Sequence, residues 1–182
     1  MKIIDTGFKG LQIIKPNVFA DARGYFFESY NQSVLQNAGI NFIPVQDNES
    51  KCMKGVIRGL HYQLNPYSQS KLIRVIKGRI FDVALDLRSD SLTFGKWFGI
   101  ELNSDTKEQF LIPAGFAHGF SVLSEEAIIQ YKCDRLYHPQ YERGISVKDP
   151  EIDINWQIGS AQPIISEKDI KQPLFKVAEF NF

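Results

Sequence analysis

Short runs rich in Ile, Val, Phe and Tyr recur along most of this chain, and Gly, Pro, Asn and Asp interrupt them at close intervals. The run Arg79–Leu87 alternates strictly, with large apolar side chains at every second position and Asp82, Ala84 and Asp86 between them. A period of two places successive side chains on opposite faces of a strand. Many short strands separated by turn residues are typical of a β-sandwich or barrel, so we predict an all-β fold.

The turn residues also predict which strands are neighbours. Lys71–Ile76 and Arg79–Leu87 flank Lys77-Gly78, which predicts a tight hairpin. Phe116–Leu123 and Ala127–Cys133 are joined by three polar residues, which predicts a second hairpin. The remaining runs predict further extended segments at Ile3–Ile14, Gly24–Tyr30, Phe42–Ser50, Trp97–Leu102 and Phe110–Ile112.

Two short helices are predicted from capping residues. Asn31 can cap a helix that turns Val34 and Leu35 inward and ends at Gly39. Ser166-Glu167-Lys168-Asp169 has the pattern of a capping box that opens a short helical turn. We expect the rest of the chain beyond residue 139 to be largely irregular.

The totals favour one globular domain over residues 1–182 and exclude several classes of protein. Hydrophobic residues make up 43% of the chain, which argues against disorder. Lys plus Arg equals Asp plus Glu, at 21 each, which argues against a nucleic-acid or anionic-membrane partner. Cys52 and Cys133 are the two cysteines, so neither a disulfide framework nor a four-cysteine zinc site is expected. No stretch resembles a secretory signal or a membrane helix, and the reducing cytoplasm is the expected compartment.

The segment Gly55–Gln63 is unusually polar for a buried strand. It carries a cation, an imidazole, a phenol and an amide within six positions. Gly59 suggests a bulge or a close backbone approach, and a bulge would allow Arg58 and His61 to face one cavity despite their odd spacing. A half-exposed strand with one hydrogen-bonded histidine explains the segment equally well.

Strand parity gathers more polar groups onto apolar faces. His118, Tyr131 and Lys71 each share a strand face with large hydrophobic neighbours. Burying such groups is costly unless they find partners. Together with His61, they predict a shared polar cavity between the strands.

The histidine spacing argues against the metal centre found in many cupins. Such a centre needs two histidines one residue apart, a carboxylate and a further histidine. Neither His61 nor His118 has a second histidine at that spacing. We therefore predict metal-free chemistry. A histidine base, a cation for an enolate oxygen and a phenol acid suit proton transfer beside a carbonyl group.

From about Met1 to Phe175 the chain resembles the dTDP-4-dehydrorhamnose 3,5-epimerase family. The matching motifs occur in the family's order at Phe19–Glu28, Gln46-Asp47-Asn48, Arg58–Gln63, Gly95-Lys96-Trp97, Ile112–Phe120, Tyr131-Lys132 and Ser166–Asp169. The resemblance implies a cupin-type jelly roll that works as a homodimer without metal or cofactor. It also implies conversion of dTDP-4-dehydro-6-deoxy-D-glucose to dTDP-4-dehydro-β-L-rhamnose in dTDP-L-rhamnose synthesis.

The resemblance assigns the catalytic roles to four residues. His61 is implied as the general base with Asp169 as its orienting partner, Lys71 as the group that stabilises the enolate oxygen, and Tyr131 as the proton donor. Each has a structural alternative. Asp169 could simply complete the capping box, Lys71 could be a solvated lysine at a strand end, and Tyr131 could be a core tyrosine with its hydroxyl at the rim.

The resemblance also implies the substrate contacts. A diphosphate suits the bidentate guanidinium group, which matches Arg23 and Arg58. The Arg23 segment and the N-terminal strands are implied to contribute to the partner subunit's site and to the dimer. The other implied contacts are Phe26, Glu28, Gln46, Asp47, Asn48, His118, Tyr137, Glu142 and Lys168. Without the family, Arg23 could be a surface turn residue, residues 46–48 a polar turn, and His118 a satisfied buried histidine.

Three rival functions remain open at this level. A C3-only epimerase or a 3,4-ketoisomerase acting on a related dTDP-4-keto-6-deoxyhexose is the nearest. A non-catalytic jelly roll that binds a nucleotide sugar would need no base and acid, so His61 and Tyr131 argue against it. A metal-dependent cupin dioxygenase is the most distant. The residues do not decide whether one or two carbons react.

Overall fold

The computed structural model describes residues 1–182, which form fourteen strands, two short α-helices and two 3₁₀ turns. The strands are β1 (Lys2–Asp5), β2 (Gln12–Lys15), β3 (Phe19–Asp21), β4 (Gly24–Phe26), β5 (Gln46–Met53), β6 (Val56–Gln63), β7 (Lys71–Lys77), β8 (Arg79–Asp86), β9 (Trp97–Asn103), β10 (Gln109–Ile112), β11 (Phe116–Val122), β12 (Glu126–Cys133), β13 (Glu142–Gly144) and β14 (Ile164–Ile165). The helical elements are α1 (Gln32–Asn37), α2 (Glu167–Ile170), η1 (Pro139–Tyr141) and η2 (Phe175–Val177).

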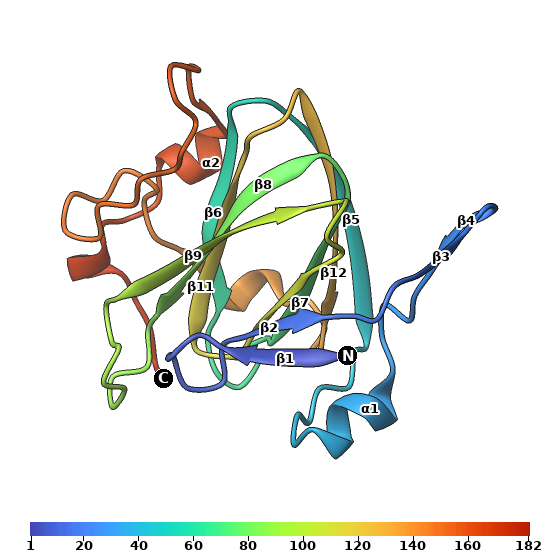
Figure 1. Cartoon of the computed structure of the whole chain (residues 1–182). Coiled ribbons are helices and arrows are strands. Elements are labelled where there is room, and N and C mark those ends of the chain that lie inside the picture. The colour runs from blue at the N-terminus through green and yellow to red at the C-terminus, as the bar shows by residue number, and fades with distance from the viewer.

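Two six-stranded sheets face each other and enclose the interior (Figure 1). The first has the strand order β1-β2-β10-β7-β12-β5, and the second has the order β13-β6-β11-β8-β9 with β14 beside β6. The predicted all-β class with a few short helices is confirmed. No helix is long and apolar enough to cross a membrane.

The chain crosses from one sheet to the other at both positions where the sequence predicts a hairpin. β7 pairs with β10 and β12, whereas β8 pairs with β9 and β11. β11 and β12 likewise belong to different sheets. Both predicted hairpins are therefore wrong. Gly78 permits the β7–β8 corner, because it has a φ of +82° and a Cβ there would lie 2.2 Å from the carbonyl oxygen of Glu126.

The core has two main layers, one on each side of the second sheet, and a smaller third cluster in which Leu35 of α1 packs against the first sheet. Between the sheets, side chains such as Ile73, Phe110 and Phe120 form one cluster. On the outer face of β8, the alternating apolar residues from Phe81 to Leu87 form a second cluster with residues of the C-terminal segment. Both faces of β8 are therefore buried, and the small or acidic residues between those apolar positions point into the interior.

Short local signals predict the N-terminal elements well. The Asn31 side chain accepts a hydrogen bond from the backbone N–H of Val34 at 3.2 Å, Leu35 is buried, and Gly39 follows the helix with a φ of +79°. The predicted strand at Ile3–Ile14 is interrupted and becomes β1 and β2, which pair with each other. The predicted extended segment from residue 42 becomes β5 only at residue 46.

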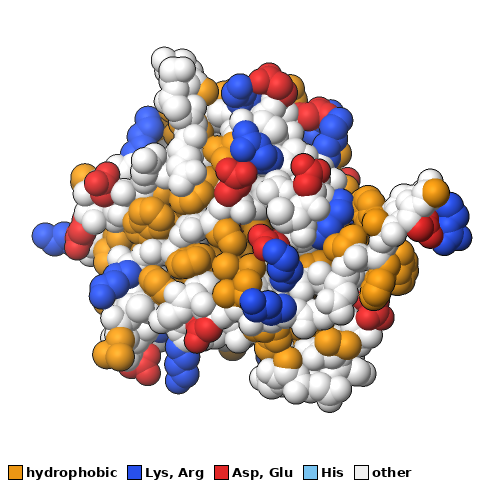
Figure 2. All heavy atoms as spheres, viewed as in Figure 1, with side chains coloured by type: hydrophobic (Ala, Val, Ile, Leu, Met, Phe, Trp, Pro, Cys, Tyr) orange, Lys and Arg blue, Asp and Glu red, His pale blue; other side chains and the backbone are white.

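β3 and β4 form an arm that projects from the body (Figure 1). Its aromatic side chains are largely exposed, at 65% for Phe19, 59% for Tyr25 and 66% for Phe26. Figure 2 shows hydrophobic side chains along the arm and charged side chains at its tip. An exposed apolar patch of this kind is typical of a surface that binds another molecule.

Asp86 organises the connection between β8 and β9. Its buried carboxylate accepts two hydrogen bonds from the Arg88 guanidinium, at 2.8 and 2.7 Å, and one each from the hydroxyls of Ser91 and Thr93, both at 2.7 Å. Arg88 also lies over the ring of Phe116, 4.5 Å from its centroid. Although burial opposes ionisation of Asp86, these hydrogen bonds hold its pKa below the usual value.

We expect Asp86→Ala to lower the free energy of unfolding by about 3–5 kcal/mol, because removing one partner leaves the Arg88 charge and two hydroxyls without their acceptor. Chemical denaturation of the variant and of Asp90→Ala, an exposed aspartate in the same turn, checks this. A loss in Asp86→Ala no larger than in Asp90→Ala would contradict the assignment.

Candidate active site

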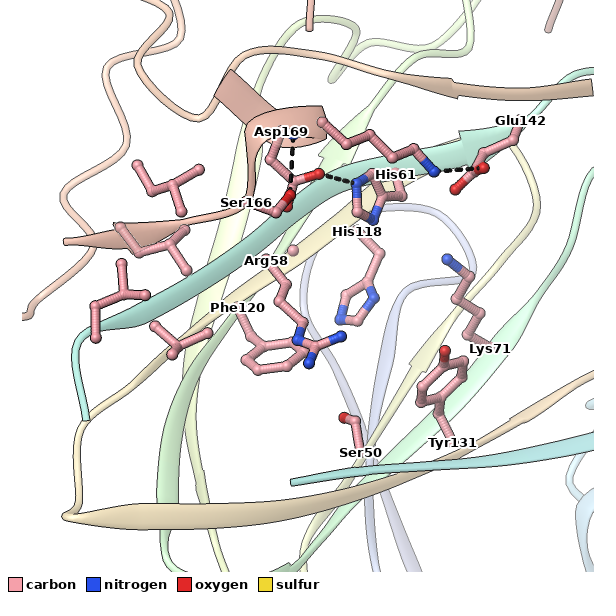
Figure 3. Close-up of a pocket in the computed structure, with 16 residues that line it drawn as sticks. Ser50, Arg58, His61, Lys71, His118, Phe120, Tyr131, Glu142, Ser166 and Asp169 are labelled. Atoms are coloured by element: carbon pink, nitrogen blue, oxygen red, sulfur yellow. Dashed lines mark hydrogen bonds and ion pairs between the residues drawn. The ribbon is translucent and has the colours of Figure 1, made fainter. Parts of the chain in front are cut away.

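A cavity of about 580 Å³ lies between the two sheets and receives side chains from both (Figure 3). β6 and β11 of the second sheet supply Arg58, His61 and His118, and β7 and β12 of the first sheet supply Lys71 and Tyr131. The shared polar cavity predicted from strand parity is thus confirmed.

The bulge predicted at Gly59 is present. His118 of β11 is opposite His61 of β6, but Phe120, two residues further on, is opposite Arg58, three residues back. A Cβ at Gly59 would lie 2.5 Å from the Cα of Gly119, so only glycine fits the contact between the strands. The extra residue brings both Arg58 and His61 to the cavity.

Asp169 is the hydrogen-bond partner of His61. Its Oδ1 lies 2.7 Å from Nε2 of His61, and the Asp169 side chain is 4% exposed whereas the imidazole is 29% exposed. Its backbone N–H donates to the Ser166 hydroxyl at 3.1 Å, so Asp169 takes part in the N-terminal cap of helix α2 and also binds His61. Burial is the largest single influence and raises the pKa of Asp169, but the hydrogen bond and charge of His61, together with hydrogen bonds from Gly59 and Ser166, make the net shift downward.

His118 has a carboxylate partner of its own. Its Nε2 lies 2.6 Å from Oδ1 of Asp82 on β8, and both side chains are buried. Burial lowers the pKa of His118, while the negative charge of Asp82 opposes this effect. The cavity therefore contains two His–Asp pairs, both from the second sheet and the helix beside it.

Lys71 and Tyr131 point into the cavity from the opposite sheet, and neither side chain makes a hydrogen bond within the chain (Figure 3). Burial lowers the pKa of the Lys71 ammonium, and the nearby groups of Cys133, Asp82 and Glu142 oppose that shift. Burial raises the pKa of Tyr131, so its hydroxyl keeps its proton. Both polar groups are free to contact a ligand.

Glu142 links two sides of the cavity. Its Oε2 accepts hydrogen bonds from the Lys168 ammonium and the Tyr137 hydroxyl, each at 2.6 Å. Burial raises the pKa of Glu142, but these two donors produce a net decrease. The pKa of Tyr137 rises to about 12, chiefly because its hydroxyl donates to Glu142.

Several of the predicted substrate contacts lie in or beside the cavity. A smaller pocket of about 110 Å³ adjoins it and shares His61, Lys71 and Tyr131 as lining residues. Gln46, Asn48 and Tyr137 line this second pocket.

Four predicted substrate contacts lie outside both pockets. Arg23 and Phe26 belong to the projecting arm, and Glu28 follows it; the Arg23 side chain is 90% exposed and paired with Asp21 at 2.6 Å. Asp47 lies on the other face of β5 from Gln46 and Asn48 and pairs with Lys132 at 2.5 Å. Within one chain, these residues do not join the site.

The sequence reasoning missed Asp82 and Ser50. The alternation of residues 79–87 places Asp82 on the face opposite the large apolar side chains. Because those apolar side chains pack under the C-terminal segment, the face that carries Asp82 points into the interior. Ser50 lines the cavity with a buried hydroxyl that has no hydrogen-bond partner. The alternation of β5, with Gln46, Asn48 and Ser50 on one face, was a usable signal for Ser50.

The fold and cavity define a β-sandwich protein with an acid–base site between its sheets, formed by imidazole, carboxylate, ammonium and phenol groups. No three His, Cys, Asp or Glu side chains lie close enough together to hold a metal ion. The model of the dTDP-4-dehydrorhamnose 3,5-epimerase family matches residues 5–177. The chain belongs to this family, which has a cupin-like fold, and it is an isomerase.

Known relatives match over nearly the whole chain. The dTDP-4-dehydrorhamnose 3,5-epimerase of Shigella flexneri is 49% identical over 99% of both chains. The crystal structure of the enzyme of the same name from Elizabethkingia anophelis is 48% identical, covers 97% of both chains and has a TM-score of 0.92. The dTDP-6-deoxy-D-glucose-3,5-epimerase of Legionella pneumophila, in complex with dTDP-4-keto-L-rhamnose, is 45% identical, covers 97% of this chain and 93% of that one, and has a TM-score of 0.92.

The lowered pKa of Asp169 predicts a pH dependence of stability. A carboxyl group with a depressed folded-state pKa stabilises the fold above its unfolded-state pKa and loses that contribution as the pH falls through the folded-state value. We therefore expect the wild type to exceed Asp169→Asn in free energy of unfolding at pH 7, and the difference to shrink below about pH 4.

Urea denaturation between pH 2 and pH 7 measures this difference. Glu167→Gln is the matched control, because Glu167 lies on the same helix with a side chain that is 93% exposed. If the difference in free energy of unfolding between wild type and Asp169→Asn stayed constant from pH 2 to pH 7, the ionised carboxylate would not be what stabilises this site.

Proposed function

We propose that the protein inverts both C3 and C5 of dTDP-4-dehydro-6-deoxy-D-glucose, giving dTDP-4-dehydro-β-L-rhamnose, by proton removal, enolate formation and reprotonation from the opposite side. The observation that carries the proposal is the placement of His61, paired with Asp169 of helix α2, on one sheet and of a free lysine and tyrosine on the facing sheet of one cavity. The names of the relatives above support the choice of substrate.

His61 is the general base. With Nε2–H donated to Asp169 at 2.7 Å, the imidazole has its lone pair on Nδ1. The carboxylate also stabilises the imidazolium ion that forms when His61 accepts a proton from carbon. The hydrogen bond from the Asp169 backbone N–H to the Ser166 hydroxyl, which caps helix α2, keeps this partner in place.

Lys71 stabilises the enolate oxygen, and Tyr131 returns the proton. The ketone at C4 acidifies the hydrogens on both neighbouring carbons, and the charge that develops on its oxygen is met by the ammonium group. Since Tyr131 retains its proton and rises from the sheet opposite His61, it can protonate the enolate carbon on the face opposite the one from which His61 removed the proton. One enolate site flanked by two reactive carbons allows the same residues to act twice.

Arg58 is the diphosphate contact within the chain. Its Nε donates to the sulfur of Cys52 at 3.2 Å, which fixes the side chain while its two terminal nitrogens stay free for bidentate contacts. Glu142 and Lys168 form an ion pair. The rest of the nucleotide sugar is contacted by this pair and by Gln46, Asn48 and Tyr137. No cofactor takes part.

The projecting arm completes the site of a second subunit in a homodimer. Phe26 and Arg23 lie on an exposed arm and do not contact a ligand in the cavity of their own chain. An exposed aromatic ring can stack on a nucleotide base, and the neighbouring guanidinium can bind a diphosphate. Asp47 and Glu28, which also lie outside the pockets, are assigned to the same interface rather than to direct contact within one subunit.

Replacing His61 by Asn should abolish deuterium incorporation from D₂O at both C3 and C5, a loss of at least about 100-fold in the exchange rate. Proton NMR of the 4-keto sugar during incubation measures this. His138→Asn is the control, because that ring packs on Tyr67, 3.7 Å between centroids, and lines neither pocket. Exchange at the wild-type rate in His61→Asn would refute the base assignment.

The same spectra count the reacting carbons. Deuterium at C3 alone would identify a C3-only epimerase, and a shift of the carbonyl group would identify a 3,4-ketoisomerase.

For Tyr131→Phe, epimerised product should fall about 100-fold while exchange of the substrate hydrogens falls much less, because the base remains and the acid is lost. The ratio of product formed to deuterium incorporated, from one NMR time course, gives the result. Tyr67→Phe controls for removing a hydroxyl outside the cavity lining. Equal losses of exchange and product would assign Tyr131 another role.

A further inference from the structure

Asp82 is a buried carboxylate in the cavity region to which the mechanism above gives no role. It has no exposed surface, and Oδ1 lies 2.6 Å from Nε2 of His118. Its Oδ2 is buried without a hydrogen-bond partner. An unpartnered polar oxygen in the interior destabilises the fold, so stability does not account for an aspartate at this position.

Asp86 shows what a structural aspartate on this strand looks like. It lies four residues further along β8 on the same face, and it is equally buried. Both of its oxygens are satisfied, by Arg88, Ser91 and Thr93. Asp82 instead makes its one side-chain hydrogen bond with His118, which lines the cavity.

The second ring nitrogen of His118 is left for a ligand. Nδ1 makes no hydrogen bond within the chain, yet it is not among the buried polar atoms that lack a partner, so it has surface open to the cavity. When Nε2 carries the proton that it donates to Asp82, neutral His118 presents an acceptor at Nδ1.

We propose that Asp82 is a positioning residue that fixes His118 in the Nε2–H form, so that Nδ1 accepts a hydrogen bond from a sugar hydroxyl of the substrate. This rests on the proposed function and assigns His118 the recognition of a hydroxyl, whereas Lys71 meets the enolate oxygen. A histidine with the opposite tautomer would offer that hydroxyl a second donor in place of an acceptor.

The electrostatic surroundings agree with a neutral ring. Burial is the largest influence on the pKa of His118 and lowers it; Lys71 on β7 and His61 on β6 lower it further, and Asp82 on β8 is the group that raises it. Removing the Asp82 charge should therefore lower the pH at which His118 becomes protonated.

Nitrogen-15 NMR of histidine-labelled enzyme tests the tautomer without any substrate. In the wild type, the His118 signals should show a protonated Nε2 and an unprotonated Nδ1. In Asp82→Asn the two forms should mix and the protonation midpoint should fall. Asp86→Asn is the control, which should lose thermal stability and keep the wild-type His118 signals. Unchanged His118 signals in Asp82→Asn would overturn the proposal.

Kinetics test the consequence for the substrate. Asp82→Asn should lower kcat/KM for epimerisation about 10- to 100-fold, and the double variant Asp82→Asn/His118→Asn should be no slower than His118→Asn alone. Losses that multiply in the double variant would show that Asp82 acts independently of His118. A wild-type enzyme that does not turn over the 4-keto sugar would refute the proposed function, whereas normal turnover by Asp82→Asn refutes this inference alone.

Discussion

The close contact between β6 and β11 is the constraint on which the site depends. At Gly59 and Gly119 the two backbones approach so closely that a Cβ on either glycine would lie less than 3 Å from the opposite strand, 2.5 Å from Gly119 Cα in one case and 2.7 Å from the Arg58 carbonyl oxygen in the other. The bulge that results changes the pairing register. A regular strand would direct Arg58 and His61 to opposite faces, and the two side chains would then not share a cavity.

Two buried aspartates support this arrangement at different cost. Asp169 makes hydrogen bonds both within the first turn of helix α2 and with His61, so the same residue stabilises the C-terminal segment and orients the imidazole. Asp82 leaves one oxygen unpaired, and nothing in the fold compensates for it. Proteins accept such local losses at functional sites, where orienting a reacting or recognising group outweighs a small loss of stability.

Local signals in the sequence predicted the elements better than their connections. The cap at Asn31, the N-cap at Ser166 and the bulge at Gly59 are each specified by a few adjacent residues, and all three are present. The capping box at Ser166 is only half formed, because the Asp169 carboxylate binds Gly59 and His61 instead of the Ser166 backbone N–H. The prediction of a hairpin at Lys77-Gly78 is wrong because a glycine turn between two alternating strands is compatible with two arrangements. The two strands can pair with each other, or the chain can turn a corner from one sheet to the other. Only the packing of the whole sandwich distinguishes them.

The same limitation explains which site residues were found. His61, Lys71, His118 and Tyr131 stand out because each interrupts an apolar face, and the cavity contains all four. The alternation of β8 identified Asp82 as polar but not which face of the strand was inward, since that depends on the C-terminal segment packing over the apolar face. The sequence alone could not place Arg23 either, because Arg23 lies on an exposed arm and pairs only with Asp21 of the same arm.

The sandwich architecture itself places His61 and Tyr131, the proposed base and acid, on opposite sides of the cavity. Because the chain alternates between the sheets from β5 to β8, and again from β10 to β12, residues close in sequence face each other across the interior. His61 on β6 and Lys71 on the next strand belong to opposite sheets, and so do His118 and Tyr131 on β11 and β12. Inversion at carbon needs a proton removed from one side and returned from the other. In the proposed mechanism, the two facing sheets provide these two directions.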